Sequence, residues 1–326
     1  MNPSLVKLLR CPKTKQKLYL EAEEYIDGRV YSGVLISEDR QNKYPIREFI
    51  PRFVPKSNYA DSFGMQWNIF SKTQLDSYSG HPISYERLWK ATGWNPNGLE
   101  NKLVLDVGCG AGRFAEIALN AGANVVAMDY SRAVDACYNN LRHFSTLNVI
   151  QADIYSMPFA EESFDFVYCL GVLQHTPDVE KAFMALPHLV KKGGVLCIDI
   201  YEKSIISPLL PKYWLRPITK RIPKVTLFSI VKNLVPFLLP ISIVISKIPI
   251  IGKYLRRIIP VANYSGVYPL DEKQIYEWAV LDTFDWLSPE YDQPQKEKTI
   301  KSWFEKAGMR DIEVLKAGHL VGRGRK

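Results

Sequence analysis

Short apolar runs alternate with stretches of helical apolar spacing across residues 101–200. Apolar runs bounded by glycines and carboxylates are typical of buried parallel strands, and the stretches between them are typical of amphipathic helices. This alternation predicts an α/β fold with a doubly wound parallel sheet. The predicted strands cover residues 103–105, 124–129, 149–154, 163–170 and 195–200.

The helical patterns extend into the C-terminal part of the chain. Residues 182–190 predict a helix that Pro187 bends and that residues 191–194 end, because glycine allows a left-handed cap. The other predicted elements are helices at 271–280 and 299–307, an antiparallel hairpin at 312–315 and 319–321, and a frayed basic end at 322–326.

Three glycines alternate after the first predicted strand, at Gly108, Gly110 and Gly112, and Asp106 precedes them. Glycine has no Cβ, so this turn lets a ligand lie against bare backbone. Dinucleotide enzymes use the spacing G-x-G-x-x-G to hold a pyrophosphate, whereas this loop has G-x-G-x-G. The spacing therefore disfavours a dinucleotide or nucleotide-sugar enzyme. A plain tight turn between strand and helix is the alternative interpretation.

Carboxylates follow the next two predicted strands, at Asp129 and Asp153. An acid at the end of the second strand of such a sheet can accept both ribose hydroxyls of a nucleoside. Capping of the following helix or turn is the alternative role for each carboxylate.

The stretch 103–116 resembles motif I of the class I S-adenosylmethionine-dependent methyltransferases of the type 11 kind, and the two later acids and residues 157–159 continue the resemblance. It implies a Rossmann-like, mostly parallel seven-stranded sheet and S-adenosyl-L-methionine as the cofactor. The implied cofactor-binding residues are Asp106, Gly108, Cys109, Gly110, Gly112, Asp129, Tyr130, Asp153, Ile154 and Leu170.

The resemblance also implies separate roles for these residues. Asp106 lies near the ligand's ammonium group, and Tyr130 lies against the adenine face. Asp153 bonds the adenine amino group while Ile154 packs on the ring. Leu170 ends the fourth strand, where open α/β sheets bind their ligands.

Other residues are candidates for the acceptor side of the reaction. His175 has a pKa near neutrality in its ordinary state, so it can act as a general base, or it can hold a loop. Methyl transfer depends mainly on positioning, and a base is not essential. Gln66 and Trp67 resemble lid residues, and Asp285 and Tyr291 lie in a late segment that resembles an acceptor-pocket motif. Packing of aromatics in the core and an ordered loop are the alternatives.

The first 60 residues resemble a degenerate zinc-ribbon-like module. Cys11 and the Tyr44-Pro45-Ile46 stretch fit that pattern, but Thr14 stands where a second cysteine is expected. A tetrahedral zinc site needs four ligands, so we predict a metal-free module, with an unrelated β-rich cap as the alternative. Its expected packing residues are Leu18, Leu20, Val30, Val34, Leu35, Ile36 and Ile46.

The composition is that of a globular protein, with 47% hydrophobic residues in 326. The N-terminal residues lack the basic start and apolar core of a signal peptide. The five cysteines are scattered, which is typical of reduced thiols. Both features predict a cytoplasmic protein.

The net charge of +8 is concentrated in one segment. Eleven Lys/Arg and no Asp/Glu lie between Lys203 and Pro260, amid long apolar runs with Trp214. The longest uncharged run is too short to span a bilayer, and Pro236 and Pro240 are expected to interrupt it. We predict that this insertion, residues 203–268, lies on an anionic membrane surface. A cap packed on the core and a dimer surface are alternatives, and the aliphatic runs disfavour nucleic acid.

Together these patterns predict an S-adenosylmethionine-dependent methyltransferase that acts on a small-molecule or lipid-like acceptor. Its expected parts are a zinc-ribbon-like module (1–60), a lead-in or lid segment (61–100) and a methyltransferase domain (101–326) that carries the insertion. The predicted location is cytoplasmic, with peripheral membrane attachment. The alternative function is a regulatory protein that binds S-adenosylmethionine without catalysis.

Overall fold

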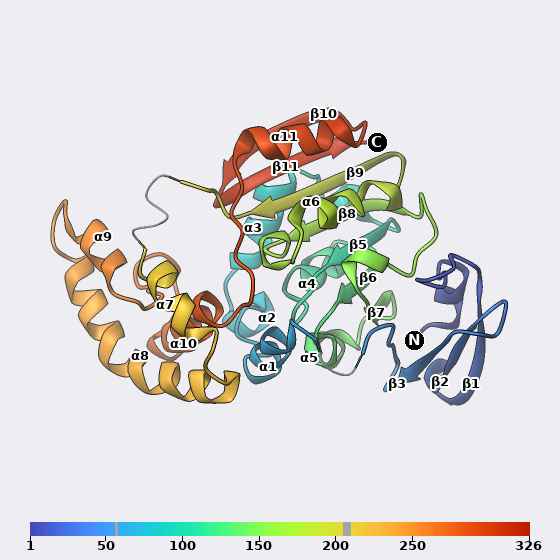
Figure 1. The fold of residues 1–326 in the computed structure, drawn as a ribbon, viewed down its shortest axis with the longest axis horizontal. Helices are drawn as coiled ribbons and strands as arrows, with labels where there is room; N and C mark the ends of the chain where they lie inside the picture. The colour runs from blue at the N-terminus through green and yellow to red at the C-terminus, as the bar shows by residue number, and fades with distance from the viewer. Residues whose placement is uncertain (56–57, 205–209) are drawn as a thin grey trace.

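The computed structural model describes residues 1–55, 58–204 and 210–326. Its centre is a seven-stranded sheet in the order β10-β11-β9-β8-β5-β6-β7 (Figure 1). β11 is antiparallel to both of its neighbours and the other pairs are parallel, which confirms the predicted doubly wound fold. The strands are β5 (Leu103–Val107), β6 (Asn124–Asp129), β7 (Leu147–Gln151), β8 (Phe164–Leu170), β9 (Val190–Ile200), β10 (Arg310–Ala317) and β11 (His319–Arg325).

Apolar side chains alternate between the two faces of this sheet. In β5, Val104 belongs to one core cluster and Leu105 to the other, as expected for strands that are buried on both faces. Phe114 of α4 packs in the first cluster, and Phe183 of α6 and Phe304 of α11 pack in the second. The helices of the core are α1 (Asp61–Ile69), α2 (Asp76–Ser79), α3 (Ile83–Thr92), α4 (Arg113–Asn120), α5 (Ala133–Leu141), α6 (Val179–Met184) and α11 (Glu297–Lys306).

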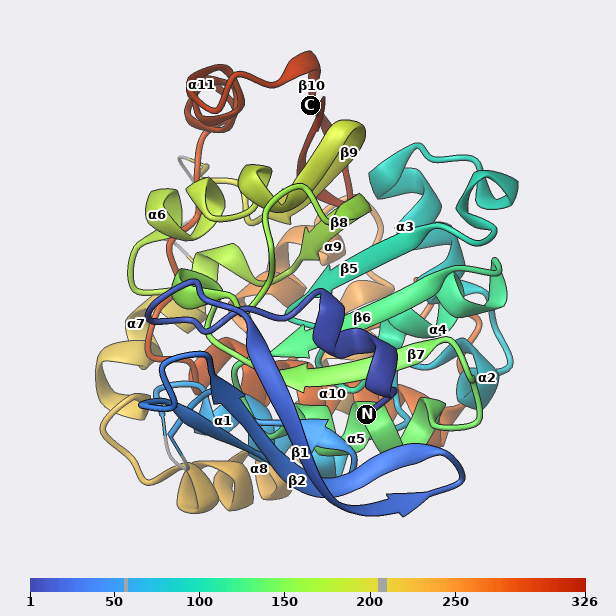
Figure 2. The ribbon, with the colours of Figure 1, turned by 90° about the vertical axis from the view of Figure 1, so that its right-hand side faces the viewer.

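A second, antiparallel sheet at the N-terminus lies beside β7 (Figure 2). Phe53 N donates to Gln151 O at 2.8 Å, and an isolated bridge joins Leu9 to Phe159. The bond to Gln151 continues the main sheet at the end of its edge strand β7, where backbone groups would otherwise be unpaired. The strands are β1 (Leu18–Ile26), β2 (Arg29–Ser37), β3 (Lys43–Arg47) and β4 (Ile50–Pro51).

Cys11 is buried within this N-terminal part, and its Sγ lies 3.2 Å from Oη of Tyr44. Within the described ranges, no group of three or more His, Cys, Asp or Glu is placed to hold a metal ion. The likeness to a zinc ribbon stays a prediction. Of the expected packing residues, Leu20 and Val34 are half-buried, and those that are buried are Leu18, Val30, Leu35, Ile36 and Ile46.

The helix predicted at 182–190 is wrong in its bounds. α6 ends at Met184, and a 3-10 turn begins at Pro187, which has no N–H to continue a helix. Residues 191–194 do not cap a helix but bulge out of β9, because Phe164 pairs with Val190 and Phe166 already pairs with Val195.

Two further predictions near the C-terminus need correction. The predicted helix at 271–280 continues as α10 (Glu272–Leu287), so the first half of the segment 282–292 is helical. The basic end is not frayed, because β11 pairs with β9 as far as Arg325. A Cβ at Gly322 or Gly324 would lie within 2.7 Å of the Phe304 ring, so these glycines let α11 pack closely on the strand.

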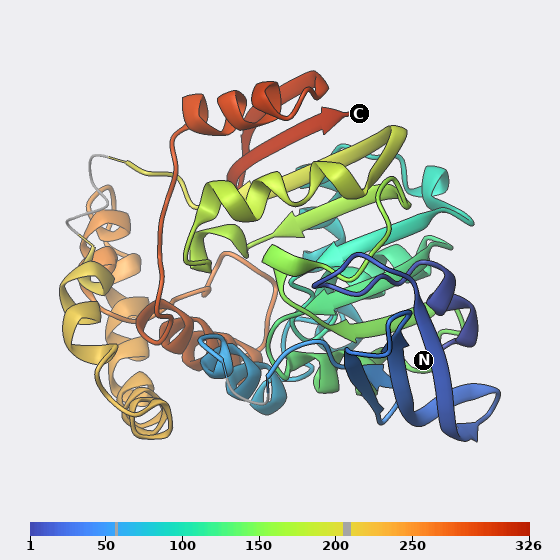
Figure 3. The same ribbon diagram turned by 45° about the vertical axis from the view of Figure 1, so that its right-hand side comes forward.

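The insertion forms three helices on the side of the molecule away from the N-terminal sheet (Figures 1 and 3). They are α7 (Pro211–Thr219), α8 (Lys224–Ser246) and α9 (Gly252–Leu255), while residues 205–209 of the predicted insertion lie outside the described part.

The prediction that Pro236 and Pro240 interrupt the apolar run is wrong, because α8 continues through both. The carbonyl of Lys232, which Pro236 cannot bond, accepts from Oη of Tyr276 at 3.3 Å. By length and composition alone, α8 is apolar enough to cross a membrane, with a mean hydropathy of 2.0 over its most apolar window, of which 22% is buried.

Candidate active site

A cavity of about 1030 Å³ opens at the carboxyl ends of β5, β6 and β8. Its wall includes residues 107–111 after β5, 128–130 at the end of β6 and 170–172 at the end of β8. α1 and α10 and the segment after α9 line the opposite side. Open α/β sheets bind ligands at this edge, so the fold places the glycine loop where the sequence predicts a ligand.

The glycine loop lines the cavity with Gly108, Cys109 and Gly110, and its backbone amides are bonded within the protein. The amides of Gly108 and Cys109 donate to Met128 O at 2.7 and 3.0 Å, and the amide of Gly112 donates to Cys109 O at 2.9 Å. The amide of Gly110 donates to Oδ2 of Asp129 at 3.0 Å. None of these four N–H groups is left for a phosphate, which disfavours a pyrophosphate ligand as the spacing predicts.

Gly108 and Gly112 cannot be exchanged for larger residues without a clash. Gly108 has φ +81°, and a Cβ there would lie 2.3 Å from Cγ2 of Val172. Gly112 has φ +96°, and its Cβ would lie 2.7 Å from Leu141. Only glycine adopts these backbone angles without strain. These two glycines are thus a steric requirement of this turn.

Asp106 lies beneath the loop, and its Oδ2 is buried without a hydrogen-bond partner among the described residues. Burial, with a smaller contribution from the nearby charge of Asp129, raises the pKa of Asp106 to about 8. An unpartnered buried carboxyl group is costly unless a donor or cation meets it. Asp106 is not among the residues that line the cavity, so its contact with a ligand ammonium stays a prediction.

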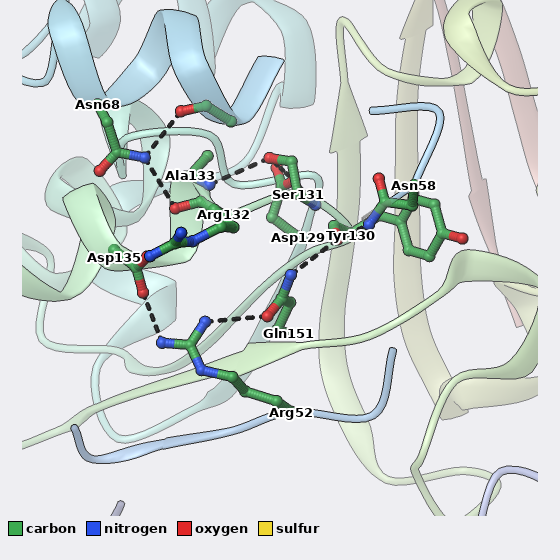
Figure 4. A network of polar contacts seen from close by, with 11 residues as sticks. Arg52, Asn58, Asn68, Asp129, Tyr130, Ser131, Arg132, Ala133, Asp135 and Gln151 are labelled. Carbon is green, nitrogen blue, oxygen red and sulfur yellow. Dashed lines mark hydrogen bonds and ion pairs between the residues drawn. The ribbon is translucent and has the colours of Figure 1, made fainter. Parts of the chain in front are cut away.

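Asp129 and Tyr130 stand at the end of β6, in a network of polar contacts (Figure 4). Asp129 Oδ1 accepts from the backbone N and Oγ of Ser131 at 2.8 and 2.7 Å, so the predicted alternative, a local cap, also occurs. The Tyr130 carbonyl accepts from Asn58 and Gln151 at 3.0 and 3.1 Å. Both Asp129 and Tyr130 line the cavity.

The three remaining cofactor candidates are placed differently. Ile154 and Leu170 are buried and line the cavity. Asp153 is not among the residues that line it, and its Oδ1 caps a short 3-10 turn by accepting from Tyr155 N at 2.9 Å. The proposed contact of Asp153 with a ligand therefore stays a prediction.

His175 is buried against the cavity, and its Nδ1 lies 2.9 Å from the carbonyl oxygen of Tyr291. A carbonyl only accepts, so Nδ1 carries the hydrogen and Nε2 presents a lone pair. Burial lowers the pKa of His175 to about 4, which keeps the ring neutral near pH 7. The Tyr291 side chain is not part of the cavity wall and packs on Tyr59 instead, with ring centroids 5.7 Å apart.

Gln66 and Trp67 reach the cavity from α1, as the lid prediction requires. The Trp67 ring covers the glycine loop, because a Cβ at Gly110 would lie 3.3 Å from it. Gln66 is fully buried and its Nε2 donates to Oδ1 of Asp285 at 3.4 Å. These contacts bring together two sequence regions that no local pattern connects.

Two charged residues of the cavity wall, Arg87 and Arg113, and a buried carboxylate that pairs with Arg87, Asp199, were missed from the sequence. The buried Asp199 of β9 is paired with Arg87 at 2.8 Å and accepts from the amide of Gly171; burial opposes its charge, yet Arg87 holds the pKa of Asp199 below its ordinary value. Arg113 is buried and donates to Ser84 at 2.8 Å. The only sequence signal for these residues was Asp199 itself, a carboxylate inside the apolar run 195–200.

Comparison with known proteins agrees with this geometry. Residues 105–198 match the family model described as a methyltransferase domain. The chain is 33% identical over 137 residues to a ubiquinone biosynthesis O-methyltransferase of Aliivibrio fischeri, which covers 40% of this chain and 58% of that protein. It is 36% identical over 101 residues to a sterol 24-C-methyltransferase of Pneumocystis carinii, covering 29% of this chain and 27% of that protein. The chain thus spans between about a quarter and little more than half of the length of these curated relatives.

Solved structures of methyltransferases also align with this chain, at low sequence identity. A SAM-dependent methyltransferase from Aquifex aeolicus covers 72% of this chain and 89% of its own, with a TM-score of 0.39 and 14% identity. A phosphoethanolamine N-methyltransferase of Haemonchus contortus covers 84% of this chain and 48% of its own, with a TM-score of 0.46 and 15% identity.

Proposed function

We propose that this chain, which contains a class I S-adenosylmethionine-dependent methyltransferase domain, transfers a methyl group to a small-molecule or lipid-like acceptor. The observation that carries the proposal is the glycine loop above Asp106. Gly108, Cys109 and Gly110 line the cavity, while Oδ2 of Asp106, buried beneath the loop, lacks a partner among the described residues. A ligand with an ammonium group and a flat apolar part fits this arrangement.

Four residues at or beneath the cavity wall would hold the cofactor. Asp106 would meet the ammonium group, Asp129 the ribose hydroxyls, and Tyr130 and Ile154 the adenine. When bound, S-adenosyl-L-methionine supplies the methyl group. Gln66 and Trp67 would cover the loop from α1, and neutral His175 offers Nε2 to the acceptor side of the cavity.

Calorimetry with the product S-adenosylhomocysteine, in parallel with NAD, tests the cofactor assignment. We expect saturable binding of S-adenosylhomocysteine and none of NAD. Replacement of Asp129 by Asn is expected to weaken binding about tenfold or more, because it exchanges a carboxylate for a weaker acceptor of hydrogen bonds. Failure of S-adenosylhomocysteine to bind at millimolar concentration would contradict the proposal.

A regulatory protein that binds the same cofactor without catalysis is the alternative function. Incubation with methyl-labelled S-adenosylmethionine and a lipid extract distinguishes the two. Label that moves into the organic phase supports the enzyme, and cofactor binding without transfer to any extract supports the regulatory protein.

The acceptor side of the cavity favours a partly apolar molecule. Trp278, Trp286, Tyr268, Ile259 and Val261 line it together with a few polar groups. The curated relatives named above carry the names of ubiquinone and sterol methyltransferases. Both observations support a lipid-like acceptor for this chain.

We infer that the insertion also meets a membrane surface, because α8 carries two apolar stripes. One stripe, with Leu227, Val231, Val235 and Leu239, is buried against α10. The other points outward at spacings of four and three residues, and its members are 40–71% exposed. They are Ile230, Leu234, Phe237, Ile241 and Val244.

The cations of the insertion divide into two groups. Lys212 pairs with Asp292 at 2.9 Å, and Arg216 donates to the carbonyls of Trp286 and Pro289, so these cations fix the insertion to the core. Others are exposed and form no ion pair within the part of the chain that the structure describes. These are Arg221, Lys232, Lys247 and Arg257. Exposed cations beside exposed apolar side chains suit an anionic lipid surface, where each adds about 1 kcal/mol.

Flotation with vesicles of phosphatidylcholine and phosphatidylglycerol tests this surface. We expect binding at low salt that weakens as salt screens the charges. Phe237→Glu with Ile241→Glu should reduce binding at least tenfold, whereas Ser229→Glu with Asn233→Glu adds the same charge elsewhere on α8 and should have a much smaller effect. A protein that stays wholly in solution at low salt would refute the membrane surface, and a stable dimer that Phe237→Glu dissociates would identify the stripe as a subunit interface.

A further inference from the structure

The α10 wall of the cavity gathers groups that accept hydrogen bonds. Asp282 and Asp285 are three residues apart on α10, so their side chains share one face of the helix. Both are half-buried and line the cavity. Asp282 Oδ2 accepts from the hydroxyl of Tyr264, and Asp285 Oδ1 accepts from Gln66 Nε2 at 3.4 Å. The second oxygen of each carboxylate has no partner among the described residues.

Gln66 adds a further unsatisfied acceptor to this wall. Its side chain is 0% exposed, and its Oε1 has no hydrogen-bond partner in the described part of the chain. The amide orientation follows from the bond of Nε2 to Asp285, which leaves Oε1 as the free atom. A buried amide oxygen without a partner is unfavourable until a donor reaches it.

His175 presents another acceptor to the same cavity. It is 8% exposed, and its Nε2 has no partner among the described residues while Nδ1 is held by the Tyr291 carbonyl. Tyr201 also lines the cavity, and burial keeps the pKa of its hydroxyl well above the ordinary value, so that this group retains its proton.

Three cationic side chains of the cavity are already engaged, whereas Lys90, Arg256 and Arg257 line the cavity without an ion pair among the described residues. The ammonium of Lys212 pairs with Asp292 at 2.9 Å, and the guanidinium of Arg87 pairs with Asp199 at 2.8 Å. Arg113 donates to Ser84 and to Gln74 at 2.8 and 2.9 Å. No ion pair reaches Asp282 or Asp285 within the described ranges. The wall therefore has an excess of acceptors over donors.

We propose that Asp285, Asp282 and Gln66 form the subsite for the polar group of the acceptor, and that this group bears O–H or N–H donors rather than being a carboxylate. That the bound molecule is a methyl acceptor rests on the proposed function. The preference for O–H or N–H donors follows from the geometry of the cavity wall alone. A hydroxyl or an ammonium group satisfies the free oxygens of the two carboxylates and of Gln66. A carboxylate at the same place meets two acids, and the three engaged cations described above are bonded to other groups.

Three matched compounds test the preference by calorimetry on the full-length protein, with and without S-adenosylhomocysteine. Phenylpropanol, phenylpropylamine and phenylpropanoate share one aromatic body and differ only in the polar end. We expect the alcohol and the amine to bind at least about tenfold more tightly than the carboxylate, the difference of one charge-assisted hydrogen bond. The tighter of the two identifies the donor as a hydroxyl or an amine.

Variants locate the subsite. Asp285→Asn keeps an acceptor oxygen and removes the charge, so it should weaken the amine about tenfold and the alcohol less. Asp285→Leu and Gln66→Met should weaken both. Glu86→Gln removes an exposed carboxylate elsewhere on the cavity wall and should leave all three affinities unchanged. Thermal unfolding of each variant checks that it is folded.

Different results would contradict the proposed subsite and the proposed methyltransferase function. If the carboxylate binds as tightly as the alcohol, or if folded Asp285→Leu binds all three compounds like the unaltered protein, the subsite is overturned even where S-adenosylhomocysteine binds. If S-adenosylhomocysteine fails to bind while the compounds keep their expected order, the subsite stands and the methyltransferase function does not.

Discussion

Asp106 illustrates at the scale of one residue how a binding site is kept at the expense of stability. Its carboxyl group is 2% exposed and one oxygen lacks a partner, so the ionised form is disfavoured in the ligand-free protein. The folded pKa of about 8 lies above the unfolded value of about 4. Between these two values the folded state binds more protons than the unfolded state, so this group lowers stability progressively as pH rises.

Asp106→Asn should therefore stabilise the ligand-free protein at pH 8, by an amount on the order of 2 kcal/mol. At pH 3 the difference should shrink towards zero, because the carboxyl group is then mostly protonated in both states. Urea denaturation at the two pH values measures this. The same variant should bind S-adenosylhomocysteine at least about tenfold more weakly, through loss of a charged hydrogen-bond acceptor. A variant that is destabilised at pH 8 would contradict the assignment of a buried, unpartnered carboxyl group.

A comparison of Gly108 with Gly193 can distinguish the effect of backbone strain from the effect of a steric clash. They have similar φ angles, +81° and +79°, but a Cβ at Gly108 meets Val172 at 2.3 Å whereas nothing lies within 4 Å at Gly193. Alanine at either position should cost about 1–2 kcal/mol of backbone strain. Only Gly108→Ala should add a clash in the loop and abolish S-adenosylhomocysteine binding in calorimetry. Equal binding by both variants would show that the loop tolerates a side chain.

At the scale of one element, α8 joins a structural face to an exposed face. Leu227 is 1% exposed against α10, and Leu234 two turns later is 48% exposed. The same residue type thus stands in both environments on one helix. The pair allows the two roles of the helix to be measured separately.

Leu227→Ala should destabilise the protein by about 2–4 kcal/mol, the cost of a cavity in a packed core. Leu234→Ala should change stability by less than about 0.5 kcal/mol, as surface substitutions do. Vesicle flotation should show the reverse order, with weakened binding for Leu234→Ala and nearly unchanged binding for folded Leu227→Ala. If Leu234→Ala costs as much stability as Leu227→Ala, the outer stripe is packed within the fold and no membrane face exists there.

At the scale of the whole molecule, the N-terminal sheet and the main sheet share one core. Leu9 is fully buried in the cluster that also holds Phe164 and Phe183 of the main domain. Backbone bonds from Phe53 to Gln151 continue the edge of the main sheet. These contacts predict that the two parts unfold together.

Leu9→Ala tests this coupling, because all seven tryptophans lie outside the first 60 residues. If the parts unfold together, tryptophan fluorescence should report a single transition that is destabilised by about 2–4 kcal/mol. An unchanged tryptophan transition would mean that the N-terminal sheet unfolds on its own. Leu20→Ala, at a half-buried position of the same module, should have a smaller effect and serves as the control.

Local features of the chain were sufficient for the central fold. Strand runs such as 124–129 and the glycine turn after β5 depend on side-chain period and on backbone freedom, which neighbouring residues determine. The same local patterns predicted the acids at or near the ends of three successive strands, β5, β6 and β7. Where prediction failed, as at Lys191 and Arg325, distant segments decided the conformation by pairing with these residues or covering them.

The sequence by itself determined the α/β class, the glycine loop with Asp106 and Asp129, and a basic apolar insertion, because these depend on residue type and short spacing. Tertiary structure alone decided that Gln66 meets Asp285, that Asp199 pairs with Arg87, and that α8 runs unbroken through two prolines. Each of these features depends on groups that lie far apart in the chain. Whether such a group is buried, and whether it has a hydrogen-bond partner, is decided only when the chain folds.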